Sequence, residues 1–113
     1  MNIVFDIGGT KMRFAEIIGN EISDPIIVNT PDSYIESIAE ISEIILKISK
    51  GKKVDCLAGG IAGVLSKDAK KLLLSPNLKD WVNRPLMDDL SRISGAKVFI
   101  KNDTEMVALG EAV

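Results

Sequence analysis

The first group of residues whose types and spacing suit chemistry consists of Asp6, Gly8, Gly9, Thr10 and Lys11. Consecutive glycines leave backbone N–H groups accessible, and Thr10 and Lys11 add a hydroxyl donor and a positive charge, which together favour phosphate oxygens. Asp6 could hold Mg²⁺ through water, because magnesium keeps much of its hydration shell. The segment is neither a Walker loop nor a Rossmann fingerprint, since a strand is predicted after it in place of a helix. A glycine turn that binds nothing is the alternative interpretation.

The second group is Asn102 and Asp103, at the predicted junction of a strand and a helix. A carboxylate at a helix N-terminus is favoured in its ionised form. Asp103 could therefore accept a proton from an attacking hydroxyl in a phosphoryl transfer, a reaction that depends mainly on positioning and charge neutralisation. Asn102 with Glu105 also matches a capping box, so a purely structural cap is the alternative. The two roles are compatible if Asn102 caps the helix while Asp103 faces a cleft.

The elements that must position these groups follow from the hydrophobic pattern, which predicts an α/β domain of order β-β-β-α-β-α-β-α. Five strands are predicted, over residues 2–7, 11–18, 21–28, 54–57 and 97–101. Helices are predicted over residues 33–50 and 85–94, with a last helix from about residue 102. The first three strands form an antiparallel meander. The last two follow helical crossovers, so we expect them to run parallel to the first strand.

The first helix carries isoleucines at spacings of three and four, which predicts one buried face made of Ile35, Ile38, Ile41, Ile45 and Ile48. A capping box is expected at residues 33–36 and a C-cap glycine at position 51. The second helix is closed by a glycine at position 95 and is predicted to bury Leu86, Leu90 and Ile93.

Two segments without helical periodicity lie between these helices. Three glycines within residues 58–63 predict a loop where the backbone approaches something closely. Residues 66–75 are interpreted as an exposed β-hairpin with lysines on its outer face. Ligands of open α/β sheets bind beyond the carboxyl ends of the strands. Asp6, the glycine loop and Asp103 all fall at that edge in this topology, which predicts a common site there.

Composition excludes several classes of function. The chain has 113 residues, which is the size of one domain, and its net charge of -2 argues against nucleic acid as a main partner. The absence of histidine excludes a Ser-His-Asp triad and histidine-ligated zinc. The single cysteine, Cys56, excludes an internal disulfide. No signal peptide and no apolar run of ~20 residues is found, so a cytoplasmic protein without a membrane span is expected.

With these elements in order, the sequence resembles the ROK sugar kinases (repressor, open reading frame, kinase). Residues 6–11 resemble that family's first phosphate motif, and residues 60–63 resemble its glycine loop beside the sugar. Residues 75–78 together with Trp81 resemble its "PNL…W" segment. Asn102 and Asp103, followed by residues 108–111, resemble its "ND…ALGE" motif. The resemblance covers essentially the whole chain.

The resemblance implies an actin-like ATPase (RNase H-like) fold and a glucokinase-like transfer of the γ-phosphoryl group of ATP to a hexose hydroxyl. It implies that Asp103 is the catalytic base and that Gly63, Asn77 and Asn102 also contact the sugar. Residues 6–11 would approach the nucleotide phosphates and Mg²⁺. The same motifs fit glucose, fructose, mannose and N-acetylated hexosamines, with ATP or polyphosphate as the donor.

The sequence departs from the family pattern in two ways. Ala62 stands where the family often has proline, and Thr104 and Glu105 replace a small residue and an asparagine, which bears on sugar preference more than on reaction type. The E-x-G-H sugar motif and the cysteine-rich zinc motif of the family's second lobe are absent. Residues 1–113 are therefore expected to be the N-terminal lobe, inactive without its C-terminal partner, because the cleft needs two walls.

Two other interpretations remain open. One is the non-catalytic, sugar-sensing domain of a ROK repressor, ranked lower because the first strand starts at residue 2 and the chain is slightly acidic. The other is an actin-like assembly module, ranked lowest because it does not need Asn102 and Asp103. Apolar surface left by a missing lobe is compatible with homo-oligomers.

Overall fold

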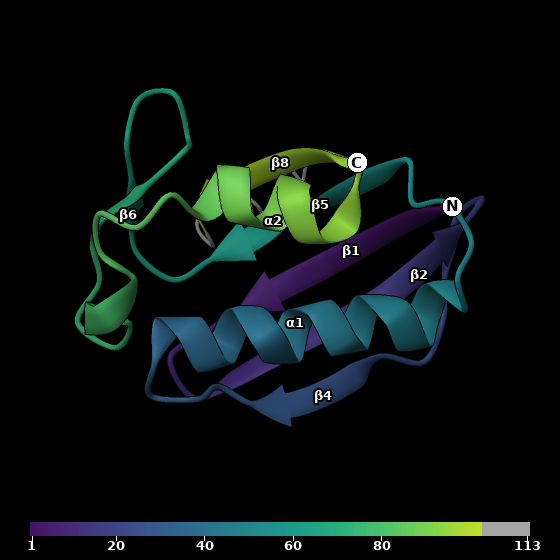
Figure 1. Cartoon of the computed structure of the whole chain (residues 1–113), viewed down its shortest axis with the longest axis horizontal. Helices are drawn as coiled ribbons and strands as arrows, with labels where there is room; N and C mark the ends of the chain where they lie inside the picture. The colour runs from purple at the N-terminus through teal and green to yellow at the C-terminus, as the bar shows by residue number, and fades with distance from the viewer. Residues whose placement is uncertain (103–113) are drawn as a thin grey trace.

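The computed structural model describes residues 1–102. It contains a mixed sheet of six strands (Figure 1). Its strands are β1 (Asn2–Ile7), β2 (Lys11–Ile18), β3 (Glu21–Ile22), β4 (Ile26–Asn29), β5 (Cys56–Ile61) and β8 (Lys97–Asn102). The order is β3-β2-β1-β5-β8, and β4 also pairs with β2. The predicted directions are confirmed: β1 pairs antiparallel with β2 and parallel with β5, which in turn pairs parallel with β8.

The sheet has one strand more than the five predicted because residues 21–28 do not form a single strand. They are divided into β3 and β4, which both pair antiparallel with β2. Asp24 and Pro25 lie between the two strands. Proline has no N–H to donate to a ladder, so pairing stops there and resumes at Ile26.

Both helices, α1 (Tyr34–Ser49) and α2 (Leu86–Ser94), cover the same face of the sheet, as Figure 1 shows. Side chains alternate along a strand, so Ile3, Phe5 and Ile7 of β1 all point to this face and are buried. They form one core with buried residues of β2, β5, β8 and both helices, namely Met12, Phe14, Leu57, Ile61, Val98, Ile100, Ile41, Ile44, Ile45, Leu86 and Leu90. Ile93 is partly buried against this core, as expected for the second helix.

The buried face of α1 differs from the predicted isoleucine stripe. Ile35 is 70% exposed, while Tyr34 and Ile44 are buried. The Tyr34 ring packs edge-on against the Trp81 ring with centroids 5.3 Å apart, which turns position 34 inward in place of position 35. The prediction of Ile35 as a core residue was therefore wrong, because a long-range aromatic contact decides the helix orientation.

The ends of α1 lie within one residue of those that the sequence predicted, and the C-cap is Lys50 in place of the predicted Gly51. Ser33 is the N-cap, and its Oγ accepts a hydrogen bond from the Glu36 N–H at 3.3 Å. At the other end, Lys50 (φ 53°) and Gly51 (φ 82°) are both left-handed and stop the helix. Gly95 (φ 68°) ends α2 in the same way.

The predicted boundary between strand and glycine loop was wrong. β5 runs through Gly59 and Gly60, so only residues 62–63 form the turn that follows it. A Cβ on Gly59 would lie 2.0 Å from the Phe5 carbonyl oxygen. The glycine therefore serves a close approach, as predicted, but the partner is the backbone of the neighbouring strand β1.

A small separate hairpin follows, made of β6 (Val64–Leu65) and β7 (Leu72–Leu74). A hairpin was predicted over residues 66–75, and one is present, but its first strand lies before residue 66. Lys67, Lys70 and Lys71 are exposed on its turn. A short 3-10 helix, η1 (Lys79–Trp81), leads on to α2.

The strand predicted over residues 97–101 extends one residue further, so that Asn102 pairs with Ile61 as the last residue of β8. The predicted last helix, including Asp103 and Glu105, lies outside the described residues. None of the helices in the described part of the chain has the length and apolarity that crossing a membrane requires.

Candidate functional site

The turn between β1 and β2 is held by a small set of backbone and hydroxyl contacts. The Gly8 N–H donates to the Lys11 carbonyl at 2.9 Å. Thr30, which follows β4, donates two hydrogen bonds to the turn. Its Oγ donates to the Gly8 carbonyl at 2.7 Å and its N–H donates to the Thr10 carbonyl at 2.9 Å. Within residues 1–102, no hydrogen bond uses the N–H of Gly9 or of Thr10. The N–H groups of Gly9 and Thr10 are thus available, whereas the N–H of Gly8, which was also predicted to bind phosphate, is not.

Asn77 lies directly against this turn. A Cβ added to Gly9 would be 2.2 Å from the Asn77 Cβ, so a side chain at position 9 has no space. Gly9 and Asn77 also line one pocket, of about 280 Å³. The structure therefore brings together a residue predicted to bind phosphate and a residue predicted to bind sugar.

The rest of the pocket wall comes from the segment before α1, from the loop before η1 and from η1 itself. Its other lining residues are Pro31, Asp32, Pro76, Leu78, Lys79, Asp80 and Trp81. The volume is at the lower end for small-molecule sites. Asp32, Lys79 and Asp80 were not predicted as site residues. Lys79 and Asp80 do lie inside the "PNL…W" segment that the sequence singled out, so a signal for them existed, whereas nothing in the sequence indicated Asp32.

The glycine turn after β5 contacts the hairpin and not this pocket. Gly63 has φ 141°, and a Cβ there would lie 2.5 Å from the Leu74 carbonyl oxygen. The Ala62 N–H donates to the Ile7 carbonyl at 3.0 Å, and the Ser75 hydroxyl donates to the Ala62 carbonyl at 2.8 Å. These bonds join the end of β1 and the glycine turn to Ser75, which begins residues 75–78. We refer to these residues as the Asn77 segment. Packing accounts for the glycine at position 63, whose sugar contact stays a prediction.

Asp6 is exposed on the sheet face away from the helices. Its register neighbours are Arg13 on β2 and Gly60 on β5, with Lys101 of β8 next to Gly60. Asp6 lines a separate groove of about 300 Å³ together with Arg13, and does not line the pocket that contains Asn77. Lys11 is exposed as well, two residues from Arg13 on β2 and therefore on the same face.

Asp6 is compatible with Mg²⁺ held through water, as predicted from the sequence, and not with a cation enclosed by several side chains of the described residues. The described residues contain no group of three acidic, cysteine or histidine side chains that could enclose a cation. Asp6 would therefore act as one carboxylate beside water and phosphate oxygens, which is how Mg²⁺ is usually held.

Asn102 reaches the same edge of the sheet as Asp6. It is half-buried and stands in register with Ile61, next to the Ala62 turn. Asp103, the predicted base, lies outside the described residues. Asp6, the turn at residues 8–10, Gly63, Asn77 and Asn102 are thus grouped at the carboxyl ends of β1, β5 and β8, and Gly9 and Asn77 line one pocket together.

Trp81, which lines the pocket, packs against the ring of Tyr34. Burial and the hydrogen bond that the Tyr34 hydroxyl donates to Asp89 at 2.6 Å raise the pKa of Tyr34 above its ordinary range. Trp81 is buried, and its indole Nε1 has no hydrogen-bond partner among the described residues. A buried donor without a partner costs about 1–3 kcal/mol.

Replacing Gly9 with alanine is expected to displace Asn77 and to lower the free energy of unfolding by about 1–3 kcal/mol, the usual effect of overpacking. The measurement is a ¹H–¹⁵N NMR spectrum, in which the Asn77 side-chain amide signals should move. The matched control is Gly19→Ala, because Gly19 has open space around it and should leave the Asn77 signals in place. Unmoved Asn77 signals in Gly9→Ala would contradict the contact.

Comparison with known proteins places this site in a family. The sequence profile described as the ROK family matches residues 2–113. A glucokinase of Thermotoga maritima is 32% identical over an alignment of 112 residues, which covers 94% of this chain and 34% of that protein. The crystal structure of a ROK family glucokinase from Streptomyces griseus, in complex with glucose and AMPPNP, matches with a TM-score of 0.86 and 30% identity over 97% of this chain and 35% of that one.

A ROK family transcriptional regulator, a homologue of the E. coli MLC protein, shares the fold at 18% identity and a TM-score of 0.75, over 96% of this chain and 29% of that one. The chain thus spans about one third of the length of these relatives. The matches confirm the predicted actin-like ATPase fold. On the strength of its profile match and of this fold, the chain belongs to the ROK family.

Proposed function

We propose that residues 1–113 are the N-terminal lobe of a kinase that transfers the γ-phosphoryl group of ATP to a hexose hydroxyl. The observation that carries the proposal is the contact between Gly9 and Asn77 inside one pocket. Phosphoryl transfer requires that donor and acceptor be held in line at close range. The proximity of Gly9, proposed to bind phosphate, and Asn77, proposed to bind the sugar, supports such an arrangement.

On the nucleotide side, the N–H groups of Gly9 and Thr10 bind phosphate oxygens, and Lys11 adds positive charge. Gly8 contributes the shape of the turn, since its own N–H is bonded to Lys11. Asp6 holds Mg²⁺ through water. Magnesium, when bound, neutralises charge that develops on the transferred phosphoryl group.

On the sugar side, Asn77, Asn102 and Gly63 bind hydroxyl groups of the hexose. Asp103 follows Asn102 directly in the sequence and accepts the proton of the attacking hydroxyl. The position of Asn102 at the carboxyl end of β8, beside the turn after β5, supports this assignment.

The relatives support the class of substrate. The Streptomyces griseus structure contains glucose and AMPPNP, and the Thermotoga maritima protein is a glucokinase. This chain corresponds to about one third of each. We therefore expect ATP and glucose or a similar hexose as substrates, and no turnover by this chain alone, because a second lobe must close the cleft.

The test is hexose-dependent ADP formation by this chain and by a protein in which it is followed by its natural downstream sequence. Glucose, fructose, mannose and N-acetylglucosamine are compared at equal concentration. We expect turnover with glucose by the longer protein and none by this chain alone. Turnover by the chain alone would contradict the need for a second lobe, and a longer protein inactive with all hexoses would contradict the kinase.

A sugar-sensing role is the second candidate, because the MLC-type regulator shares the fold with the kinases. A sensor would bind the hexose without forming ADP. Calorimetric binding of glucose by the longer protein, in the presence of ATP and Mg²⁺ and without ADP production, would identify it.

A further inference from the structure

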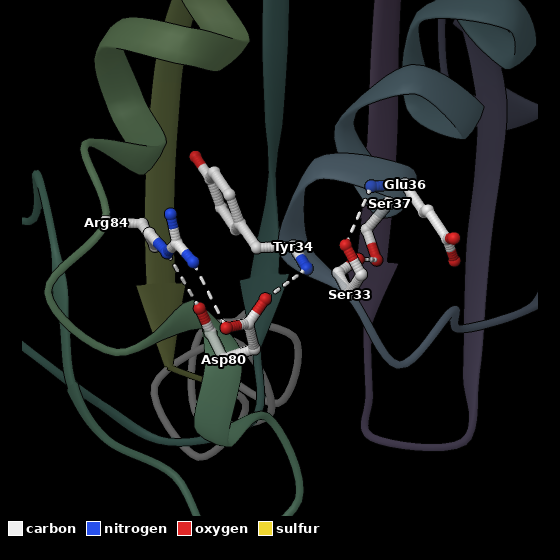
Figure 2. Close-up of polar contacts among 6 residues, drawn as sticks. All are labelled: Ser33, Tyr34, Glu36, Ser37, Asp80 and Arg84. Carbon is white, nitrogen blue, oxygen red and sulfur yellow. Dashed lines mark hydrogen bonds and ion pairs between the residues drawn. The ribbon is translucent and has the colours of Figure 1, made fainter.

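Asp80 accepts hydrogen bonds from Tyr34, at the start of α1, and from Arg84, four residues further along its own segment (Figure 2). Its Oδ2 accepts a hydrogen bond from the backbone N–H of Tyr34 at 2.7 Å. Its Oδ1 accepts one from Nη2 of Arg84 at 3.1 Å, and its carbonyl oxygen accepts one from Nε of Arg84 at 3.0 Å. We refer to Tyr34, Asp80 and Arg84 as the Asp80 clamp.

The clamp supplies a second cap to α1. The first N–H groups of a helix have no acceptor within the helix. Ser33 takes the N–H of Glu36, and Asp80, from a segment distant in sequence, takes that of Tyr34. The Tyr34 N–H and then the Arg84 guanidinium hold the pKa of Asp80 below its ordinary value. The carboxylate is therefore charged at neutral pH, which the positive end of the helix dipole favours.

The side chain of Tyr34 ties the same junction to α2. The Arg84 guanidinium lies over the Tyr34 ring, 5.3 Å from its centroid. The ring meets Trp81 edge-on, and its hydroxyl donates to Asp89 of α2. One residue at the start of α1 thus contacts both η1 and α2.

One member of the clamp, Asp80, lies in the wall of the pocket described above. Asp80 lines that pocket with Gly9 and Asn77, and it follows Asn77 by only three residues. The stretch between them is irregular or 3-10 in conformation, and Leu78 is its buried anchor. Asn77 itself is exposed, so its position depends on how its neighbours are held.

We propose that Asp80 is a positioning residue, which holds the Asn77 segment against α1 and the Gly9 turn and so presents Asn77 to the sugar. The inference rests on the proposed kinase function for its sugar-binding part. Its structural part, the ordering of Asn77 by Asp80, can be measured without any substrate.

The kinetic test compares Asp80→Ala, Asp80→Asn and Asp88→Ala in the longer protein. Asp88 is an exposed aspartate in the first turn of α2 outside the pocket and is the matched control. Asp80→Ala is expected to raise KM for glucose about tenfold, as the loss of a hydrogen bond to a charged group predicts. KM for ATP and kcat should stay within about twofold. Asp80→Asn keeps an acceptor oxygen and should restore KM for glucose to within about threefold of the original protein.

The structural test uses ¹⁵N relaxation of this chain without ligand. The order parameter of the Asn77 backbone N–H is expected to fall from about 0.85 to below about 0.6 in Asp80→Ala. It should be unchanged in Asp88→Ala and largely retained in Asp80→Asn.

The outcomes separate the two proposals. An unchanged KM for glucose in Asp80→Ala would overturn the positioning role. So would a rise in KM for ATP and a fall in kcat as large as the rise in KM for glucose. A longer protein that phosphorylates no hexose would refute the kinase. The order parameter of Asn77 would then decide the role of Asp80 by itself, and its persistence in Asp80→Ala would overturn that role.

Discussion

Replacing Asp103 with asparagine is expected to lower kcat for hexose phosphorylation by about 10²–10⁴-fold in the protein that contains both lobes. An amide of nearly the same size cannot accept the proton of the attacking hydroxyl. The affinity for glucose should change little, because asparagine still forms hydrogen bonds with sugar hydroxyl groups. The measurements are coupled ADP formation for kcat and calorimetry for glucose binding.

Asp88→Asn, on the exposed first turn of α2, is the control for this experiment and should keep full activity. A kcat near that of the original protein in Asp103→Asn would refute the assignment of the base. Equal losses of kcat and glucose affinity would point to a disturbed site in place of a lost proton acceptor.

Replacing Gly59 with alanine is expected to lower the free energy of unfolding by about 3 kcal/mol or more, because the site cannot relax. The new Cβ would lie 2.0 Å from the carbonyl oxygen of Phe5 and 2.6 Å from the Phe5 ring. Both groups belong to β1, whose ladder to β5 is central to the sheet. Urea unfolding followed by fluorescence of Trp81, which is the one tryptophan of the chain and is buried, provides the measurement.

Gly19→Ala separates crowding from backbone strain. Gly19 has φ +62° and no atom near its missing Cβ, so alanine there should cost only the strain of a left-handed residue, about 1–2 kcal/mol. The backbone of Gly59 has no such strain, and its cost comes from contact alone. A Gly59→Ala variant as stable as Gly19→Ala would show that β1 and β5 can move apart.

Local chemistry explains why much of the fold could be predicted from the sequence. Ser33 begins α1 with a side-chain hydrogen bond that serine favours, and Gly51, just after the helix, has a positive φ that glycine adopts readily. The parallel direction of β5 and β8 follows from the helical connections that precede them. The turn at residues 8–11 was predicted from its glycines.

The errors have long-range causes. Tyr34 in place of Ile35 faces the core because Trp81 meets its ring. Gly59 and Gly60 belong to a strand because β1 pairs with them, although the cluster of glycines in residues 58–63 indicates a loop. The break between β3 and β4 was signalled by Pro25, but its extent depends on pairing with β2.

The sequence by itself indicated the family and the order of the main helices and strands up to β8, because short motifs and periodicity are local properties of the chain. Only the tertiary structure decided that Gly9 touches Asn77 and that Asp80 caps a helix which begins far from it in sequence. Such contacts depend on how strands and helices pack in three dimensions, and no spacing along the chain encodes them.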